Sequence, residues 1–175
     1  MSVQVESPLI QPLSKNHDRT GFACGNDGLD KYLQVQAGQD AKRNVSACFV
    51  LVSAADPDSV AGYYTLSATA IDPGELESNV RKQLPPYPLI PATLIGRLAR
   101  NLKFKGGGIG EYLLMDALNR SLTHSKEIAS FAVVVDAIDL RIYNWYSKEW
   151  GFIPLKARSD RLYLPMKTVQ KLFEG

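Results

Sequence analysis

Short runs of apolar and β-branched residues, bounded by turn residues, predict the strands of this chain. Residues 46–53 and 60–70 are rich in Val, Phe, Tyr and Thr and flank a turn sequence at residues 55–58, so we expect an antiparallel hairpin. Residues 9–13 predict an edge strand because this run ends beside Pro12. Further strands are predicted at residues 91–102, 131–135, 151–153 and 161–165.

Apolar residues at helical spacing predict the helices between these strands. Asn26 can cap a helix whose apolar residues recur from Leu29 to about residue 36, and which continues to residues 42–43. A short helix is expected to begin at Pro73 and to end before the prolines of residues 84–88. The longest helix should follow the glycines of residues 106–110, and another is expected over residues 140–149.

The order of these elements predicts a single mixed α/β domain over residues 1–175. A chain of 175 residues and 19.3 kDa fits one domain, and no repeat, low-complexity tract or shift in composition marks a linker. The succession of strand, glycine loop, helix and strand predicts one parallel crossover beside the antiparallel hairpin.

Composition constrains the function only weakly. Hydrophobic residues make up 45% and charged residues 22%, which argues against a disordered chain. A net charge of +2 is too small to identify a nucleic-acid binder from totals alone. The longest apolar stretches are far shorter than the roughly 18 residues that cross a bilayer, and the first residues contain no basic leader or apolar h-region. We therefore expect a cytoplasmic protein without a membrane partner.

The cysteines and histidines predict neither a disulfide nor a metal site. Cys24 and Cys48 are too far apart for a CxxC pair, and in a reducing compartment both are expected to be buried thiols. His17 and His124 have no Cys or carboxylate at metal-ligand spacing, so both are expected to be surface or loop residues.

The glycine-rich sequence at residues 106–110 can bind an anion. Backbone N–H groups at a helix N-terminus lack partners and carry partial positive charge, and glycines let an anion approach them. The alternative, a tight turn without a ligand, has about equal weight for a glycine cluster alone. A Walker loop would need Gly-Lys-Ser/Thr at residues 110–112, and a dinucleotide fingerprint would need glycine at Glu111, so neither NTP nor NAD is favoured.

The distribution of charge favours an anionic ligand near this loop. No acidic residue occurs between Glu77 and Glu111. The basic residues of this segment are Arg81, Lys82, Arg97, Arg100, Lys103 and Lys105. Each of them alone is more often a solvated surface residue, but together they would attract a polyphosphate or a nucleic-acid backbone.

From Leu98 onward the chain resembles the GNAT superfamily of acyl-CoA N-acetyltransferases. The resemblance lies in the order of elements and in the loop Gln/Arg-x-x-Gly-x-Gly/Ala, whose three defined places are occupied here by Lys105, Gly108 and Gly110. It implies the GNAT fold, a central, mostly antiparallel twisted sheet with one parallel strand pair, flanked by helices, and it implies acetyl-CoA as cosubstrate. The coenzyme contacts that it implies are Leu98, Arg100, Lys105, Gly106, Gly107, Gly108, Ile109, Gly110 and Asp139. For Asp139, a helix cap is an equal alternative.

Further segments resemble the GNAT toxins of bacterial toxin–antitoxin pairs. They are residues 22–26, 29–30, 62–67, 84–88, 96–98 and 135–139, so the resemblance covers nearly the whole chain. It implies acetylation of the free α-amino group on a charged tRNA, an arrest of translation, and a ribbon-helix-helix antitoxin as partner; a homodimer is common among these toxins. The predicted contacts to tRNA phosphates are Lys42, Arg43, Arg97 and Lys103.

Tyr146 is predicted to protonate the departing coenzyme A thiolate. It matches the superfamily's tyrosine before Gly-Phe. Four residues, 147–150, separate it from Gly151, whereas relatives commonly have three residues between this tyrosine and the glycine. We therefore expect a bulged turn after Tyr146, with Tyr143 as the alternative donor. An α-amino group has a pKa of about 7.7–8.0, so a neutral fraction exists without a strong general base.

Two other functions stay open at this point. The same fold could acetylate a small-molecule or protein amine. Alternatively, Gly107, where close relatives often have arginine, and the extra residue after Tyr146 would fit a non-catalytic acyl-CoA-binding module.

Overall fold

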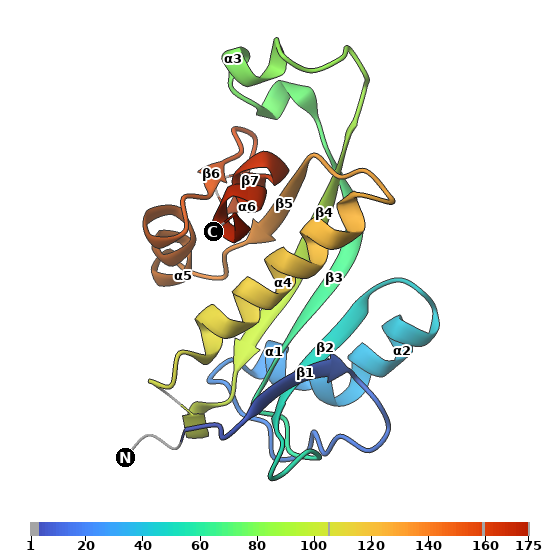
Figure 1. The fold of residues 1–175 in the computed structure, drawn as a ribbon, viewed down its shortest axis with the longest axis vertical. Coiled ribbons are helices and arrows are strands. Elements are labelled where there is room, and N and C mark those ends of the chain that lie inside the picture. Colours follow the sequence, from blue (N-terminus) through green and yellow to red (C-terminus); the bar gives the residue numbers. More distant parts are fainter. Residues whose placement is uncertain (1–3, 105, 159, 175) are drawn as a thin grey trace. The chain divides into compact units, whose positions relative to one another are not determined.

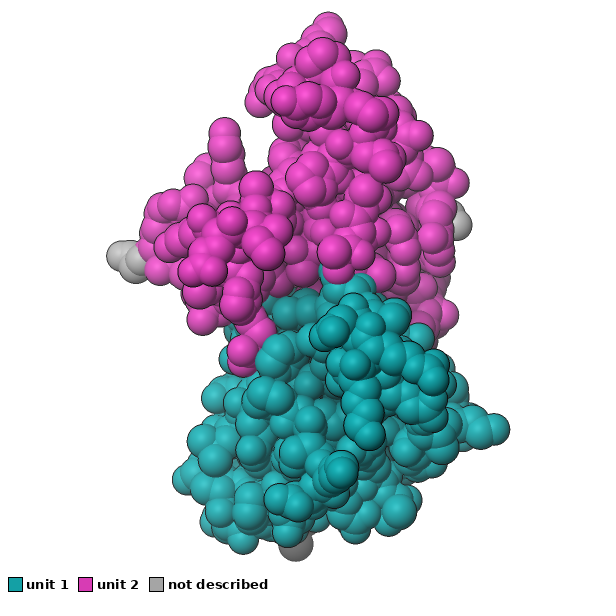
Figure 2. All heavy atoms as spheres, turned by 90° about the vertical axis from the view of Figure 1, so that its right-hand side faces the viewer, with its two compact units in different colours: residues 1–67, 96–117 teal, residues 68–95, 118–175 magenta. Residues whose placement is uncertain are grey.

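A computed structural model describes residues 4–104, 106–158 and 160–174, and its strands form one seven-stranded sheet (Figure 1). The strands are β1 (Pro8–Pro12), β2 (Ala47–Ser53), β3 (Gly62–Ile71), β4 (Ile90–Arg100), β5 (Ala132–Asp136), β6 (Ile153–Pro154) and β7 (Arg161–Pro165), in the spatial order β1-β2-β3-β4-β5-β7-β6. The chain divides into two compact units, residues 1–67 with 96–117 (unit 1) and residues 68–95 with 118–175 (unit 2) (Figure 2). That residues 1–175 form a single domain therefore stays a prediction.

The helical elements lie between the strands along the chain, except α6, which follows the last strand. The α-helices are α1 (Asp27–Lys31), α2 (Ala37–Lys42), α3 (Ser78–Arg81), α4 (Ile109–Ser125), α5 (Leu140–Asn144) and α6 (Met166–Phe173). The 3₁₀ turns are η2 (Pro73–Glu75) and η3 (Leu102–Phe104), and the π-helical turns are η1 (Tyr32–Gln36) and η4 (Trp145–Glu149). Among the described residues, no helix combines the length and hydropathy that crossing a membrane requires.

In unit 1, the predicted hairpin and edge strand are confirmed. β2 pairs antiparallel with β3, and β1 pairs antiparallel with the outer side of β2. Asn26 caps α1 as predicted, because its Oδ1 accepts a hydrogen bond of 3.0 Å from the Leu29 N–H. The helical segment η1 then buries Tyr32 and Leu33 in a core that also contains Tyr63 of β3.

The first half of α4 packs closely against β3 in unit 1. A Cβ at Gly62 would lie 2.8 Å from a Leu113 side-chain carbon and 3.1 Å from the Ala99 carbonyl oxygen, so only glycine permits this approach. The buried Tyr64 donates its hydroxyl to Asp116 of the same helix. These contacts fix the beginning of α4, and with it the glycine loop, on the sheet of unit 1.

In unit 2, the predicted parallel crossover is confirmed. β4 pairs in parallel with β5 from Ala92 opposite Ala132 to Ile95 opposite Val135, and α4 connects these strands along the chain. β7 pairs antiparallel with β5 and with β6. Four of the five residues of β5 are buried, which explains its continuous apolar sequence.

Four local predictions were wrong or incomplete. β4 ends at Arg100 and not at residue 102, because Asn101 turns the chain: its amide donates to the Val60 carbonyl, and its Oδ1 accepts from the Lys103 N–H. The helix expected from residue 73 is divided into the 3₁₀ turn η2 and the separate α3. α6 was not predicted. Cys48 is buried as expected, but Cys24 is partly exposed.

His17 is a buried loop residue, and its burial predicts a folded state that is sensitive to acid. It is 6% exposed, and the Ser14 N–H donates to its Nδ1 at 3.0 Å. Burial, and next the charge of Arg19, lower the pKa of His17 below 6.5, although Asp58 opposes this effect. Because the folded state favours the neutral ring, its contribution to stability is complete above the unfolded pKa and is lost as the pH falls through the folded pKa.

We therefore expect the thermal unfolding midpoint to fall between roughly pH 7.5 and 5.5. His17→Gln, which cannot be protonated, should fall less over this range, whereas His124→Gln, at an exposed position, should follow the wild type. Differential scanning calorimetry across this range makes the measurement. Identical pH profiles for the wild type and His17→Gln would contradict the assignment.

Candidate functional site

The glycine loop forms a left-handed turn at the beginning of α4 in unit 1. Gly106 has a φ of +85° and Gly108 a φ of +71°, values that residues other than glycine rarely adopt. The Gly107 N–H donates to the Phe104 carbonyl at 3.3 Å, which closes the turn that follows η3. The first N–H groups of α4 have no carbonyl partner within the helix, so they are available to an anion. Lys105 lies outside the described residues.

A pocket of about 160 Å³ adjoins this loop within unit 1. Its lining residues are Gln4, Val5, Pro8, Leu51, Gly107, Gly108, Ile109 and Tyr112. The N-terminal segment and two strands thus form one wall, and the loop and the first turn of α4 form the other. Gly108 contributes no side chain to this space, so a ligand can approach the backbone amides directly.

Arg97 is held in a defined position on β4. Its Cζ lies 3.5 Å from the centroid of the Tyr32 ring, a cation–π contact within unit 1. The Tyr32 hydroxyl donates to Asp40 Oδ2 at 2.7 Å, and the Gln36 amide donates to Asp40 Oδ1 at 2.8 Å. Burial raises the pKa of Tyr32 to about 12, so the phenol stays neutral. The platform under Arg97 is therefore fixed by η1 and α2.

The other residues predicted on β4 lie on this strand as expected. Leu98 and Arg100 are half-buried, and they alternate along the strand with Arg97 and the buried Ala99. Side chains of a strand alternate between its faces, so Leu98 and Arg100 lie on the face opposite Arg97. Of the remaining predicted tRNA contacts, Lys42 and Arg43 are exposed at the end of α2, and Lys103 is exposed in η3.

Tyr146 is buried among aromatic rings in unit 2. The residue is 4% exposed, and its ring centroid lies 5.1 Å from Trp145 and 5.2 Å from Phe152. Among the described residues, no group forms a hydrogen bond with its hydroxyl. Burial, and next the charge of Asp136, raise the pKa of Tyr146 well above its ordinary value. The residue is therefore a neutral phenol that can donate a proton.

The bulge expected after Tyr146 is the π-helical turn η4. This turn accommodates the extra residue before Gly151, whose φ is +75°. The Phe152 N–H donates to the Tyr146 carbonyl at 3.1 Å and closes the turn. On the neighbouring strand, Arg161 forms two hydrogen bonds of 2.7 and 2.8 Å with Asp136, so the carboxylate near Tyr146 is fixed.

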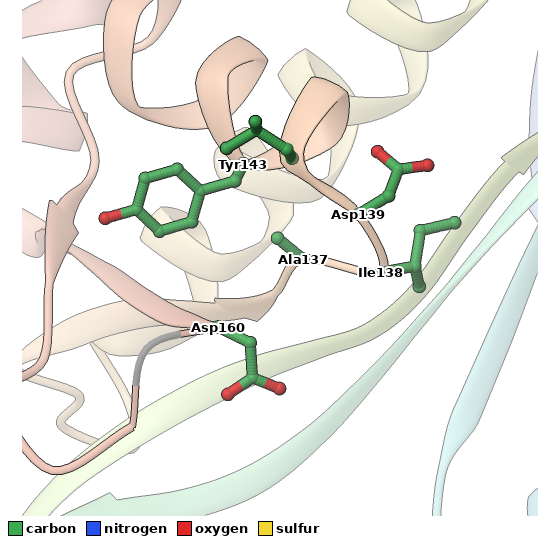
Figure 3. A pocket seen from close by; sticks show the side chains of 6 residues that line it. Ala137, Ile138, Asp139, Tyr143 and Asp160 are labelled. Atoms are coloured by element: carbon green, nitrogen blue, oxygen red, sulfur yellow. The ribbon is translucent and has the colours of Figure 1, made fainter.

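A second pocket, of about 320 Å³, lies at the end of β5 in unit 2 (Figure 3). Its lining residues are Ala137, Ile138, Asp139, Leu140, Tyr143 and Asp160. The Asp139 carboxylate caps α5 by accepting a 2.8 Å hydrogen bond from the Ile142 N–H, as the helix-cap alternative predicted. Tyr143, the alternative proton donor, lines this pocket, whereas Tyr146 does not.

Sequence reasoning missed Asp160 as a pocket residue. Its carbonyl accepts a 2.8 Å hydrogen bond from the Ala137 N–H, which joins the segment before β7 to the end of β5. No motif signals this contact between positions 23 residues apart in the chain. Within the described part of the chain, no group of three or more His, Cys, Asp and Glu residues could hold a metal ion.

The mixed sheet with its parallel β4–β5 pair, and the glycine loop at the beginning of the crossover helix, are the arrangement expected of the GNAT class of N-acetyltransferases. No family model matches the chain. It is 30% identical to a probable toxin TacT of Sinorhizobium fredii over 172 residues, and this alignment covers 94% of each chain. It is 32% identical to a tRNA-acetylating toxin of Mycobacterium tuberculosis over 126 residues, and this alignment covers 72% of this chain and 73% of that protein. The chain therefore belongs to the family of GNAT-type tRNA-acetylating toxins.

Solved structures agree with this assignment. A tyrosine-to-phenylalanine mutant of KacT has a TM-score of 0.89 at 27% identity, covering 96% of this chain and 100% of the other. AtaT complexed with acetyl-methionyl-tRNAfMet has a TM-score of 0.88 at 26% identity, covering 95% and 99%. AtaTR bound with AcCoA has a TM-score of 0.84 at 27% identity, covering 95% and 98%.

Proposed function

We propose that this protein is an acetyl-CoA-dependent N-acetyltransferase that acetylates the α-amino group of aminoacyl-tRNA and thereby blocks translation. The observation that carries the proposal is the likeness to AtaT with its acetylated aminoacyl-tRNA, which extends over 95% of the chain at a TM-score of 0.88. The glycine loop, as an anion site, and the neutral phenol of Tyr146 supply the chemistry that this reaction needs.

The coenzyme is held mainly through the backbone. The N–H groups of Gly106, Gly108, Ile109 and Gly110 bind the diphosphate, whereas the Gly107 N–H donates to the Phe104 carbonyl and holds the turn. The partial positive charge of the α4 N-terminus adds to these hydrogen bonds. Lys105 supplies a further donor. Leu98 and Arg100 belong to β4, the strand that pairs with the pantetheine arm. Asp139 contacts the coenzyme from the segment between β5 and α5.

The transfer itself needs alignment of two reactants and one proton donor. The neutral α-amino nitrogen attacks the thioester carbonyl carbon, and the carbon–sulfur bond then breaks as the tetrahedral intermediate collapses. Tyr146 donates its phenolic proton to the departing thiolate. The proton that the nitrogen loses passes through water to the Tyr146 phenolate and restores the phenol. The high pKa of Tyr146 ensures that this proton is present at cellular pH.

The tRNA is bound through its phosphates by Lys42, Arg43, Arg97 and Lys103, all of which belong to unit 1. Such contacts position the nucleic acid without selecting its sequence. We further propose that the protein acts in the cytoplasm, as a homodimer, and that a ribbon-helix-helix antitoxin neutralises it. AtaT bound to the C-terminus of the antitoxin AtaR, at 25% identity and a TM-score of 0.82, supports an antitoxin as partner.

Binding of charged tRNA should weaken steeply with salt. Each phosphate contact contributes a slope of about −0.7 to −0.9 in log K against log salt concentration, so the variant Lys42→Gln with Arg43→Gln should flatten the slope by about 1 to 2. Filter binding between roughly 50 and 200 mM salt measures this slope. The control is Lys167→Gln, an exposed lysine of α6 in unit 2, which should keep the wild-type slope. An unchanged slope in the double variant would remove these residues from the interface.

The function is tested by incubating the protein with labelled acetyl-CoA and total charged tRNA. The label should appear on an aminoacyl group, which nuclease digestion and chromatography then identify, and deacylated tRNA should accept none. Turnover of free amines without tRNA would instead indicate a small-amine acetyltransferase. Coenzyme binding without any transfer would indicate a non-catalytic module.

A further inference from the structure

The segment between α3 and β4 exposes an aromatic side chain, that of Tyr87. We define residues 84–89, Leu-Pro-Pro-Tyr-Pro-Leu, as the proline arm. Tyr87 is 63% exposed and Leu89 58% exposed, and no ring of the described residues contacts Tyr87. α3 and the proline arm lie beyond the ends of β3 and β4 in unit 2 (Figure 1).

The proline arm is rigid although it is exposed. Prolines at positions 85, 86 and 88 restrict φ at three of its six residues. The Tyr87 N–H donates to the Pro85 carbonyl at 2.8 Å, a tight turn that closes over one residue. At its ends, Leu84 is half-buried in the core of unit 2, and Ile90 after the arm is buried. The Tyr87 ring is therefore presented with little loss of conformational entropy on binding.

Two cations without acidic partners precede the proline arm. Arg81 and Lys82 are exposed at the end of α3, and neither forms an ion pair within the part of the chain that the structure describes. Glu77, the nearest acidic residue in sequence, lies 3.8 Å from Lys156. No acidic residue follows until Glu111, so the positive charge of Arg81 and Lys82 is not neutralised along the chain.

We propose that the proline arm is a single-strand contact for the charged tRNA, in which an unpaired base stacks on Tyr87 while Arg81 and Lys82 contact the flanking phosphates. This combination of an exposed ring and nearby cations is how proteins bind single-stranded nucleic acid. The inference rests on the proposed function, because a tRNA substrate supplies both unpaired bases and phosphates.

The composition of the segment favours nucleic acid over a second copy of this chain. A stable protein interface buries about 800 Å² on each side and excludes charges from its centre. The large apolar side chains that the arm exposes are Tyr87 and Leu89, and the cations Arg81 and Lys82 precede them in the chain. A single stacked base needs no larger surface, and the same cations strengthen its binding.

The test measures the affinity of the full-length protein for total aminoacylated tRNA by filter binding. Tyr87→Ala should weaken binding about 5- to 150-fold, the range expected for the loss of one stacked base. Tyr87→Phe, which keeps the ring, should bind within about twofold of the wild type, and Arg81→Gln with Lys82→Gln should flatten the salt dependence. Ile128→Ala, at an 82% exposed position of unit 2, is the matched control for loss of an exposed apolar side chain.

A positioning role predicts a selective kinetic effect. Tyr87→Ala should raise the KM for charged tRNA and leave the KM for acetyl-CoA and kcat at saturating tRNA unchanged. Wild-type affinity in Tyr87→Ala, or an equal loss in Tyr87→Phe, would overturn the inference while the acetylation of tRNA stands. A change of sedimentation mass in Tyr87→Ala at unchanged tRNA affinity would assign the arm to a second copy instead. If the wild type neither binds nor acetylates charged tRNA, the proposed function fails together with the inference.

Discussion

Replacing Tyr146 with phenylalanine should lower the rate of acetyl transfer about 10²- to 10⁴-fold, the range typical of a lost proton donor. The substitution removes one oxygen and keeps the ring contacts with Trp145 and Phe152, so the variant should fold with nearly wild-type stability. No described residue loses a hydrogen bond, because none pairs with this hydroxyl. Single-turnover measurement of label transfer to charged tRNA, beside calorimetric binding of acetyl-CoA, separates the chemical step from binding.

Tyr143→Phe is the matched control for this experiment. Tyr143 lies one helical turn before Tyr146, lines the pocket at the end of β5, and is the other phenol that the sequence offered as donor. We expect it to retain most of the transfer rate. If Tyr143→Phe lost the activity and Tyr146→Phe kept it, the roles of the two residues would be exchanged. An undiminished rate in both variants would mean that the thiolate leaves without a tyrosine donor.

The elements that could be predicted from the sequence are those fixed by neighbours along the chain. The β2–β3 hairpin follows from segments rich in β-branched and aromatic residues and from a strong turn, and the cap of α1 follows from Asn26 alone. The parallel β4–β5 pair follows from the strand–helix–strand order. In each case the decisive interaction joins residues close in sequence, or the topology leaves one arrangement.

The features that could not be predicted depend on distant contacts. β4 ends where the Asn101 amide meets the carbonyl of Val60, 41 residues earlier. The orientation of Arg97 depends on Tyr32, and that of Tyr32 on Asp40, none of which is a sequence neighbour of the strand. His17 is buried by tertiary packing, although its sequence context is that of a polar loop. α6 is an intermediate case, because its buried Met166 and Val169 have helical spacing that a local analysis could have detected.

Replacing Gly108 with alanine should weaken acetyl-CoA binding about 10- to 150-fold, as expected for the loss of one or two hydrogen bonds to a charged group. At a φ of +71° an L side chain is strained, and a shift of the backbone would turn the loop amides away from the diphosphate. The nearest atom to the added Cβ, Glu111 Oε2, lies 4.0 Å away, so the free protein has room for the methyl group. The defect should therefore appear in binding more than in folding.

Gly25→Ala separates the cost of strain from the loss of the ligand contact. Gly25 has a φ of +91°, and a Cβ there would lie 3.9 Å from Leu102, so the backbone cost is similar at a position outside the loop. Both variants should lose about 1–2 kcal/mol of unfolding free energy, but only Gly108→Ala should lose affinity for acetyl-CoA in calorimetry. Because the diphosphate is common to both ligands, free coenzyme A must show the same loss. If Gly108→Ala bound either ligand as the wild type does, the diphosphate would not be held by the amides of this loop.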